Sequence, residues 1–192
     1  MKRLFIVFIA LMLTIPSFAY AHDVPGTGGF MSGLSHPILG FDHLLAMLSV
    51  GILSAQMGGK AIWKVPATFV IVMLVGGVLG MEGVKMISVE LGIAVSVLAL
   101  GLSITIEKKL PAFIAMIFVG FFAVFHGFAH GVEMPYLAKP EYYALGFVVG
   151  TASIHIAGVV VGVFFQKIKD GQRLLRYLGA AIAGIGFYLI AM

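Results

Sequence analysis

The fold of this chain follows from one stretch, SHPILGFDHLLAMLSVGILSAQ, which covers residues 35–56. The stretch is apolar over a length sufficient to cross the roughly 30 Å hydrocarbon core of a bilayer. Its first half nevertheless carries His36, Asp42 and His43, which are costly at membrane depth and usually line a cavity or a substrate path there. We therefore expect a transmembrane segment that contributes ionisable side chains to a functional site.

The rest of the chain has the composition of an integral membrane protein. Of its 192 residues, 61% are hydrophobic and only 10% are charged, which a soluble domain with a polar surface would not show. Its 25 glycines fit helices that approach one another closely in lipid. The formal net charge of +4 is too small to indicate nucleic acid as a partner, and the chain has no cysteine. Any bound metal must therefore be held by nitrogen and oxygen ligands.

The N-terminus has the pattern of an export signal. Two basic residues precede an apolar core over residues 4–15, and residues 19–21 have the A-x-A form of a cleavage site. The core is short for a membrane span, and an uncleaved first helix is the alternative. We expect residues 1–21 to be a signal peptide and residues 22–192 to form one transmembrane domain. Cleavage would leave His22 at the terminus, where its amine and imidazole could chelate a metal together.

Six hydrophobic runs after the signal are long enough to span a bilayer, and short polar breaks separate them. They cover residues 35–56, 63–81, 84–106, 111–130, 142–166 and 174–191, and residues 26–34 are a candidate short interfacial or re-entrant helix. The expected fold class is an all-α integral membrane protein, a bundle of six transmembrane helices. Pro37 and Gly40 loosen regular helix geometry, so we expect the first span to break near them.

Basic residues indicate the orientation of this bundle, because they favour cytoplasmic loops. With the mature N-terminus outside, the inner connections hold eight basic residues, whereas the outer connections hold only Lys85 and Lys139. An export signal requires the same external N-terminus. The chain is therefore predicted to be a multi-pass protein of a bacterial inner membrane, with its mature N-terminus in the periplasm.

This orientation gathers the ligand-type side chains in the outward half of the bundle. Glu90 would lie about two turns into the third span, and the fourth span ends in His126, His130 and Glu133. Residues four and seven apart share a helix face, so these last three form one stripe. The predicted metal site contains His36, Asp42, His43, Glu90, His126, His130 and Glu133, with His22 as a further candidate.

Two roles stay open at this stage. Asp42 points away from the line through His36 and His43 unless the helix is distorted, so it is either a metal ligand or a residue that orients a histidine. His155, deeper in the fifth span, stands alone, and we expect it to be structural. Imidazole and carboxylate ligands without thiolate suit Ni²⁺, Co²⁺, Zn²⁺, Cu²⁺ or Fe²⁺, and the affinity order does not choose among them.

Two motifs in this chain resemble those of the HupE/UreJ family. They are H-P-x-x-G-x-D-H-x-x-x-M-x-x-V-G over residues 36–51 and H-G-x-x-H-G-x-E-x-P over residues 126–135, both matched without a gap. The resemblance covers essentially the whole mature chain. It implies a six-span secondary permease for nickel or cobalt, associated with hydrogenase and urease maturation. The metal would then be the transported substrate, with no cofactor, no catalytic residue and no enzymatic activity.

Other classes stay open from the residues alone. The spacing of His126 and His130 resembles one fragment of the histidine boxes in membrane di-iron oxygenases, which need several such boxes, whereas this chain has six histidines in all. A metal sensor or storage protein is a further alternative. The expected partners are the divalent metal ion and the lipid bilayer, and a homo-oligomer is left open.

Overall fold

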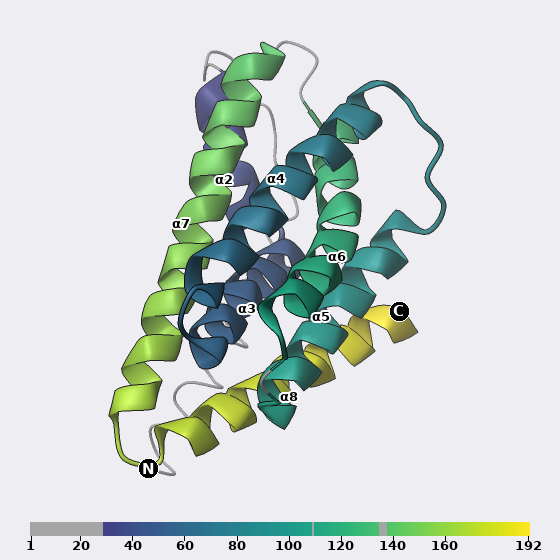
Figure 1. Cartoon of the computed structure of the whole chain (residues 1–192). Helices are drawn as coiled ribbons and strands as arrows, with labels where there is room; N and C mark the ends of the chain where they lie inside the picture. The colour runs from purple at the N-terminus through teal and green to yellow at the C-terminus, as the bar shows by residue number, and fades with distance from the viewer. Residues whose placement is uncertain (1–28, 109, 135–137) are drawn as a thin grey trace.

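The computed structural model describes residues 29–108, 110–134 and 138–192, and the regular structure in these residues is entirely α-helical. The helices are α2 (Gly29–Leu39), α3 (Phe41–Met57), α4 (Ala61–Met81), α5 (Val89–Ile106), α6 (Ala112–Val132), α7 (Pro140–Lys167) and α8 (Gly171–Ala191), as Figure 1 shows. The predicted signal peptide over residues 1–21 and the candidate ligand His22 lie outside the described residues. The prediction of an all-α membrane protein is confirmed.

The helices α4 to α8 are each long and apolar enough to cross a membrane, and α2 with α3 makes a sixth span when the bent pair is counted as one. The predicted spans agree with these helices within three residues except at the first and the third. The first span was predicted to begin at residue 35 after a separate short helix over residues 26–34, whereas α2 runs unbroken from Gly29 to Leu39. The other difference is at the third span. There α5 begins at Val89 rather than at residue 84, because Gly83 and Ser88 both have a positive φ, which an α-helix does not accommodate. Glu90 therefore lies exposed in the first turn of α5, and the prediction that it lies two turns deep is wrong.

The first span is broken, as the positions of Pro37 and Gly40 predicted. The axes of α2 and α3 differ by 81° across Gly40, which has an extended backbone with φ −79° and ψ 108°. Pro37 lies buried in the last turn of α2, where its missing N–H and its ring weaken the helix. The break leaves His36 at the end of one helix and places Asp42 and His43 in the first turn of the next.

The helices pack as close pairs: α4 against α6, α5 against α8, and α7 along both α2 and α3 (Figure 1). Glycine makes the close approach possible, because a Cβ on Gly76 would overlap the carbonyl oxygen of Val124, and one on Gly158 would overlap that of Leu48. Helix association in lipid depends on such contacts. The close approach expected from the many glycines is confirmed at three pairs spaced four residues apart, since each member contacts a neighbouring helix: Gly76, Gly80, Gly146, Gly150, Gly158 and Gly162.

Polar and apolar side chains are distributed as in a protein that faces lipid. Large apolar side chains such as Ile71, Phe121 and Phe164 are more than half exposed. Polar groups lie in the interior instead, and four of the five described histidines are buried among an apolar core that includes Phe69 and Leu100. The bundle therefore encloses the ionisable groups that the membrane would otherwise exclude.

Candidate metal site

Three residues where α2 and α6 end form what we call the outer cluster: His36, His130 and Glu133. Nε2 of His36 lies 3.0 Å from Oε2 of Glu133, and Nδ1 of His130 lies 4.0 Å from the same oxygen. Each residue offers one ligand atom, and these atoms all lie within 4.8 Å of one another. Metal bonds of about 2.0–2.2 Å would require only a small contraction of this group. Two imidazoles and a carboxylate are ligands that divalent first-row metals accept.

Glu133 supplies the negative charge of the outer cluster. It follows the last residue of α6, and its backbone N–H bonds the carbonyl oxygen of Ala129 at 2.9 Å. The hydrogen bond from His36 lowers the pKa of Glu133 below its ordinary value, an effect that outweighs the opposing effect of partial burial. The carboxylate is therefore ionised at neutral pH and can attract and hold a cation.

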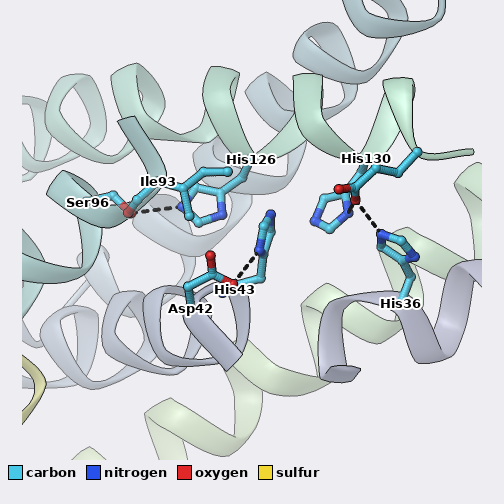
Figure 2. A network of polar contacts seen from close by, with 8 residues as sticks. His36, Asp42, His43, Ile93, Ser96, His126 and His130 are labelled. Carbon is cyan, nitrogen blue, oxygen red and sulfur yellow. Dashed lines mark hydrogen bonds and ion pairs between the residues drawn. The ribbon is translucent and has the colours of Figure 1, made fainter. Parts of the chain in front are cut away.

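A row of imidazoles continues from the outer cluster into the bundle (Figure 2). The ring centroids of His36 and His130 lie 4.7 Å apart, those of His130 and His43 lie 4.3 Å apart, and those of His43 and His126 lie 4.8 Å apart. The broken first span supplies two of these rings and α6 supplies the other two. The two sequence motifs therefore face each other across one site.

Asp42 orients His43 within this row. Its Oδ1 lies 2.9 Å from Nδ1 of His43 and accepts the backbone N–H of the same residue at 2.8 Å. Gly40 leaves room for this pair, since a Cβ there would lie 3.1 Å from Nδ1 of His43 and 3.4 Å from Oδ1 of Asp42. Carboxylates that bond the second nitrogen of a metal-binding histidine are common in proteins. The structure thus places Asp42 in the orienting position, one of the two that the sequence left open.

The helix α6 separates its ligands from its packing surface. His126 and His130 point toward α2 and α3 (Figure 2), whereas Gly127 and Gly131 lie against α4. A Cβ on Gly127 would overlap the carbonyl oxygen of Met73, and one on Gly131 would overlap the backbone of α4 one turn further along. Adjacent residues of a helix differ by about 100° in direction. The H-G-x-x-H-G motif therefore presents imidazoles to the site and bare backbone to the neighbouring helix.

Glu90 lies near the row without belonging to it. It is exposed at the start of α5, close enough for the charges of Asp42 and Glu133 to act on it. Because its side chain is exposed, its carboxylate lies at the rim of the site and not in the row.

His155 lies outside the row, and Phe69 contacts both His155 and His126. The ring centroid of Phe69 lies 5.5 Å from that of His126 and 5.2 Å from that of His155. Nδ1 of His155 donates to the carbonyl oxygen of Met47 at 2.8 Å. This backbone bond between α7 and α3 is compatible with the structural role predicted for His155.

Three residues that touch the histidines have no signal in the sequence. Oγ of Ser96 lies 2.9 Å from Nε2 of His126. The ring centroid of Phe147 lies 4.2 Å from that of His130, and the ring centroid of Tyr143 lies 6.0 Å from that of His36. A single serine or aromatic residue is ordinary in any membrane span. Only the packing of α5 and α7 around the site reveals these three.

The fold and the site together define a multi-pass helical membrane protein with a site of imidazoles and carboxylates enclosed in its bundle. The family model described as HupE / UreJ protein matches residues 9–189. Protein HupE of Rhizobium leguminosarum bv. viciae is 43% identical over 178 residues, which are 93% of each chain. The chain belongs to the HupE/UreJ family, which is associated with nickel and cobalt uptake for hydrogenase and urease. No solved structure matches the chain.

Proposed function

We propose that this protein is a secondary permease that takes up a divalent transition metal, nickel or cobalt, and supplies it to metalloenzyme maturation such as that of hydrogenase or urease. The observation that carries the proposal is the outer cluster, where two imidazoles and one carboxylate converge at the end of a membrane bundle. Family membership supports the same function. The bundle would lie in a bacterial inner membrane with the mature N-terminus in the periplasm.

The first step of transport is the exchange of water for protein ligands at the outer cluster. The carboxylate of Glu133 attracts the hydrated ion, and the exposed charge of Glu90 adds to this attraction. Nε2 of His36 donates a proton toward Glu133, so an ion that binds between them displaces this proton or turns the ring. Ligands without thiolate exchange readily with a first-row divalent ion, and a carrier needs such reversibility.

The energy source of this permease is an ion gradient or the metal gradient itself. The sequence contains no G-x-x-x-x-G-K-[ST] motif for the phosphates of a nucleotide. The metal therefore moves by facilitated diffusion or by coupling to a second ion.

Uptake into proteoliposomes tests this function. Purified protein is reconstituted with a metal-sensitive dye inside the vesicles, and Ni²⁺ or Co²⁺ is added outside, with Zn²⁺ and Cu²⁺ as competitors. We expect saturable Ni²⁺ or Co²⁺ influx that Glu133→Gln strongly reduces. Absence of flux from the folded wild-type protein, together with turnover of a lipid substrate, would overturn the permease and favour a membrane metalloenzyme.

A further inference from the structure

Three neighbouring buried imidazoles on α3 and α6 have ring nitrogens that bond none of the described residues. These nitrogens are Nε2 of His43, Nδ1 of His126 and both nitrogens of His130. Their side chains are 7%, 0% and 3% exposed. Buried polar atoms without a partner are uncommon in folded proteins, and several in one place require an explanation. A ligand shared by the three rings is one such explanation.

The tautomer of His126 follows from its contact with Ser96 (Figure 2). The hydroxyl of Ser96 has one hydrogen, and it donates this hydrogen to the carbonyl oxygen of Ile93 at 2.6 Å. Its oxygen can then only accept from Nε2 of His126, at 2.9 Å. The proton of His126 therefore lies on Nε2, and Nδ1 carries a free lone pair.

The tautomer of His43 follows in the same way from Asp42. The carboxylate accepts from Nδ1 at 2.9 Å, so the lone pair of His43 lies on Nε2. In both rings the free nitrogen is thus the buried atom without a partner. Ser96 and Asp42 leave the two nitrogens in the state that can bind a metal, because a ligating nitrogen must carry no proton.

The third ring, that of His130, lies between His36 of the outer cluster and His43. Its centroid lies 4.7 Å from that of His36 in the outer cluster and 4.3 Å from that of His43 on the other side. Neither of its nitrogens bonds a described residue. His130 can therefore keep a bond to an ion while the remaining ligands are exchanged.

We propose that His43, His126 and His130 form an inner station, which receives the ion from the outer cluster, and that Ser96 is a positioning residue for His126. The inference rests on the proposed permease and names the step that follows entry. The ion exchanges His36 and Glu133 for His43 and His126 and retains His130. Asp42, behind His43, keeps a negative charge near the ion after it leaves Glu133.

The inner station holds the ion less firmly than the outer cluster does. Among the described residues, only the outer cluster has three ligand atoms within 4.8 Å of one another, so an ion at the inner station must draw the rings together. Its three imidazoles are also neutral ligands, whereas Glu133 is an anion. A station of lower affinity deeper in the bundle favours onward movement of the ion.

Ser96→Ala and Ser54→Ala form a matched pair that tests the role of Ser96. Both serines are fully buried, and both donate to the carbonyl oxygen three residues earlier, Ser54 to Gly51 at 2.8 Å. Only Ser96 bonds a histidine among the described residues. Ser96→Ala should lower the maximal rate of Co²⁺ uptake by about 10–100-fold, the usual effect of removing such a partner, and leave Co²⁺ affinity at the outer cluster unchanged. Ser96→Thr should restore the rate.

The control result decides whether the role of Ser96 is specific. Equal uptake by Ser96→Ala and Ser54→Ala, with both variants folded by size-exclusion chromatography and thermal melting, would overturn the inner station. A change confined to Co²⁺ affinity would overturn it as well, because the outer cluster alone would then explain the result.

A binding experiment tests the inner station without transport. A variant that lacks the outer ligands, His36→Ala with Glu133→Gln, should still bind Co²⁺ and show the visible absorption bands of a nitrogen-ligated ion. Adding His126→Ala should abolish these bands, whereas adding Ser54→Ala should not. Absence of Co²⁺ binding by the outer variant would overturn the inner station. Absence of flux in the wild-type protein would overturn the permease. The Co²⁺ binding experiment would still decide whether the three imidazoles form a metal site.

Discussion

The helices α6 and α7 both combine buried histidine with glycines that touch a neighbouring helix, yet among the described residues only the histidines of α6 join the row of imidazoles. His126 and His130 of α6 lie beside other imidazoles, whereas His155 of α7 lies beside the ring of Phe69 and bonds the carbonyl oxygen of Met47. His155 also has a buried nitrogen, Nε2, that bonds none of the described residues. A buried histidine with a free nitrogen is therefore not enough for a metal site.

The neighbours of each histidine make the difference between α6 and α7. A metal ion needs at least three donors that converge on one point. The break at Gly40 brings His36 and His43 to the same face of α6, where both contact His130. The half of α7 beside the site contributes Tyr143 and Phe147 instead, which form an aromatic wall against the histidines. Of the two helices, α6 thus supplies candidate ligands and α7 supplies their enclosure.

The largest effect on uptake is expected from His130→Ala. His130 belongs to the outer cluster and to the inner station, so its loss should reduce Ni²⁺ or Co²⁺ uptake to the background of empty vesicles. The truncation leaves a cavity beside Phe147 and lowers the melting temperature, so uptake is expressed per folded molecule. Uptake and thermal melting are measured on the same preparation. Uptake close to the wild-type rate would show that α6 does not supply the essential ligands.

Gly127→Ala is expected to have the next largest effect, through folding rather than through ligands. The added Cβ overlaps the carbonyl oxygen of Met73, so α4 and α6 must move apart. Such overpacking typically costs about 1–3 kcal/mol of stability. The melting temperature in detergent should fall, and uptake should fall with the amount of folded protein.

Gly184→Ala is the control for this glycine effect. A Cβ at Gly184 meets no atom within 4 Å, so its melting temperature should match that of the wild-type protein. Equal melting of the Gly127 and Gly184 variants would show that close contact between α4 and α6 is not what holds α6 in place.

Glu90→Gln should have a smaller effect on uptake, and one that depends on salt. Glu90 is exposed and acts through its charge, and an exposed charge interaction is worth about 1 kcal/mol or less. The KM for Ni²⁺ should therefore rise by less than about fivefold, with the maximal rate unchanged. Raising the ionic strength should reduce the difference from the wild-type protein. A large loss of maximal rate would instead show that Glu90 ligates the ion during its passage.

The membrane spans could be predicted from sequence because hydropathy and helix breaking are local properties. The second predicted span, residues 63–81, differs from α4 by two residues, and the break predicted near Pro37 and Gly40 lies at Gly40. The third span was predicted too long because Val84, Met86 and Ile87 continue the apolar run of α5 despite Lys85 between them. Their departure from helical geometry depends on the backbone at Gly83 and Ser88, which hydropathy does not report.

The composition of the site could be predicted only in part. The two motifs name the histidines and carboxylates, and helical phase identified Asp42 as the residue whose geometry required a break. The partner of His126 could not be found, because Ser96 lies on another helix and bonds through tertiary packing. Whether two histidines in the same bundle are ligands or structural depends likewise on contacts between helices, as the comparison of His130 with His155 shows.

Apart from the Gly184→Ala control, His155→Ala should have the smallest effect on uptake among the variants discussed. It tests the comparison of α6 with α7 most directly. The change removes the hydrogen bond to the carbonyl oxygen of Met47 and leaves a cavity beside Phe69, so stability falls. Uptake per folded molecule should stay near the wild-type rate, because the ring of His155 contacts Phe69 and not an imidazole of the row. A loss as deep as that of His130→Ala would mean that the ion passes Phe69 and binds Nε2 of His155, in which case α7 carries a ligand of the inward path and the contrast between the two helices fails.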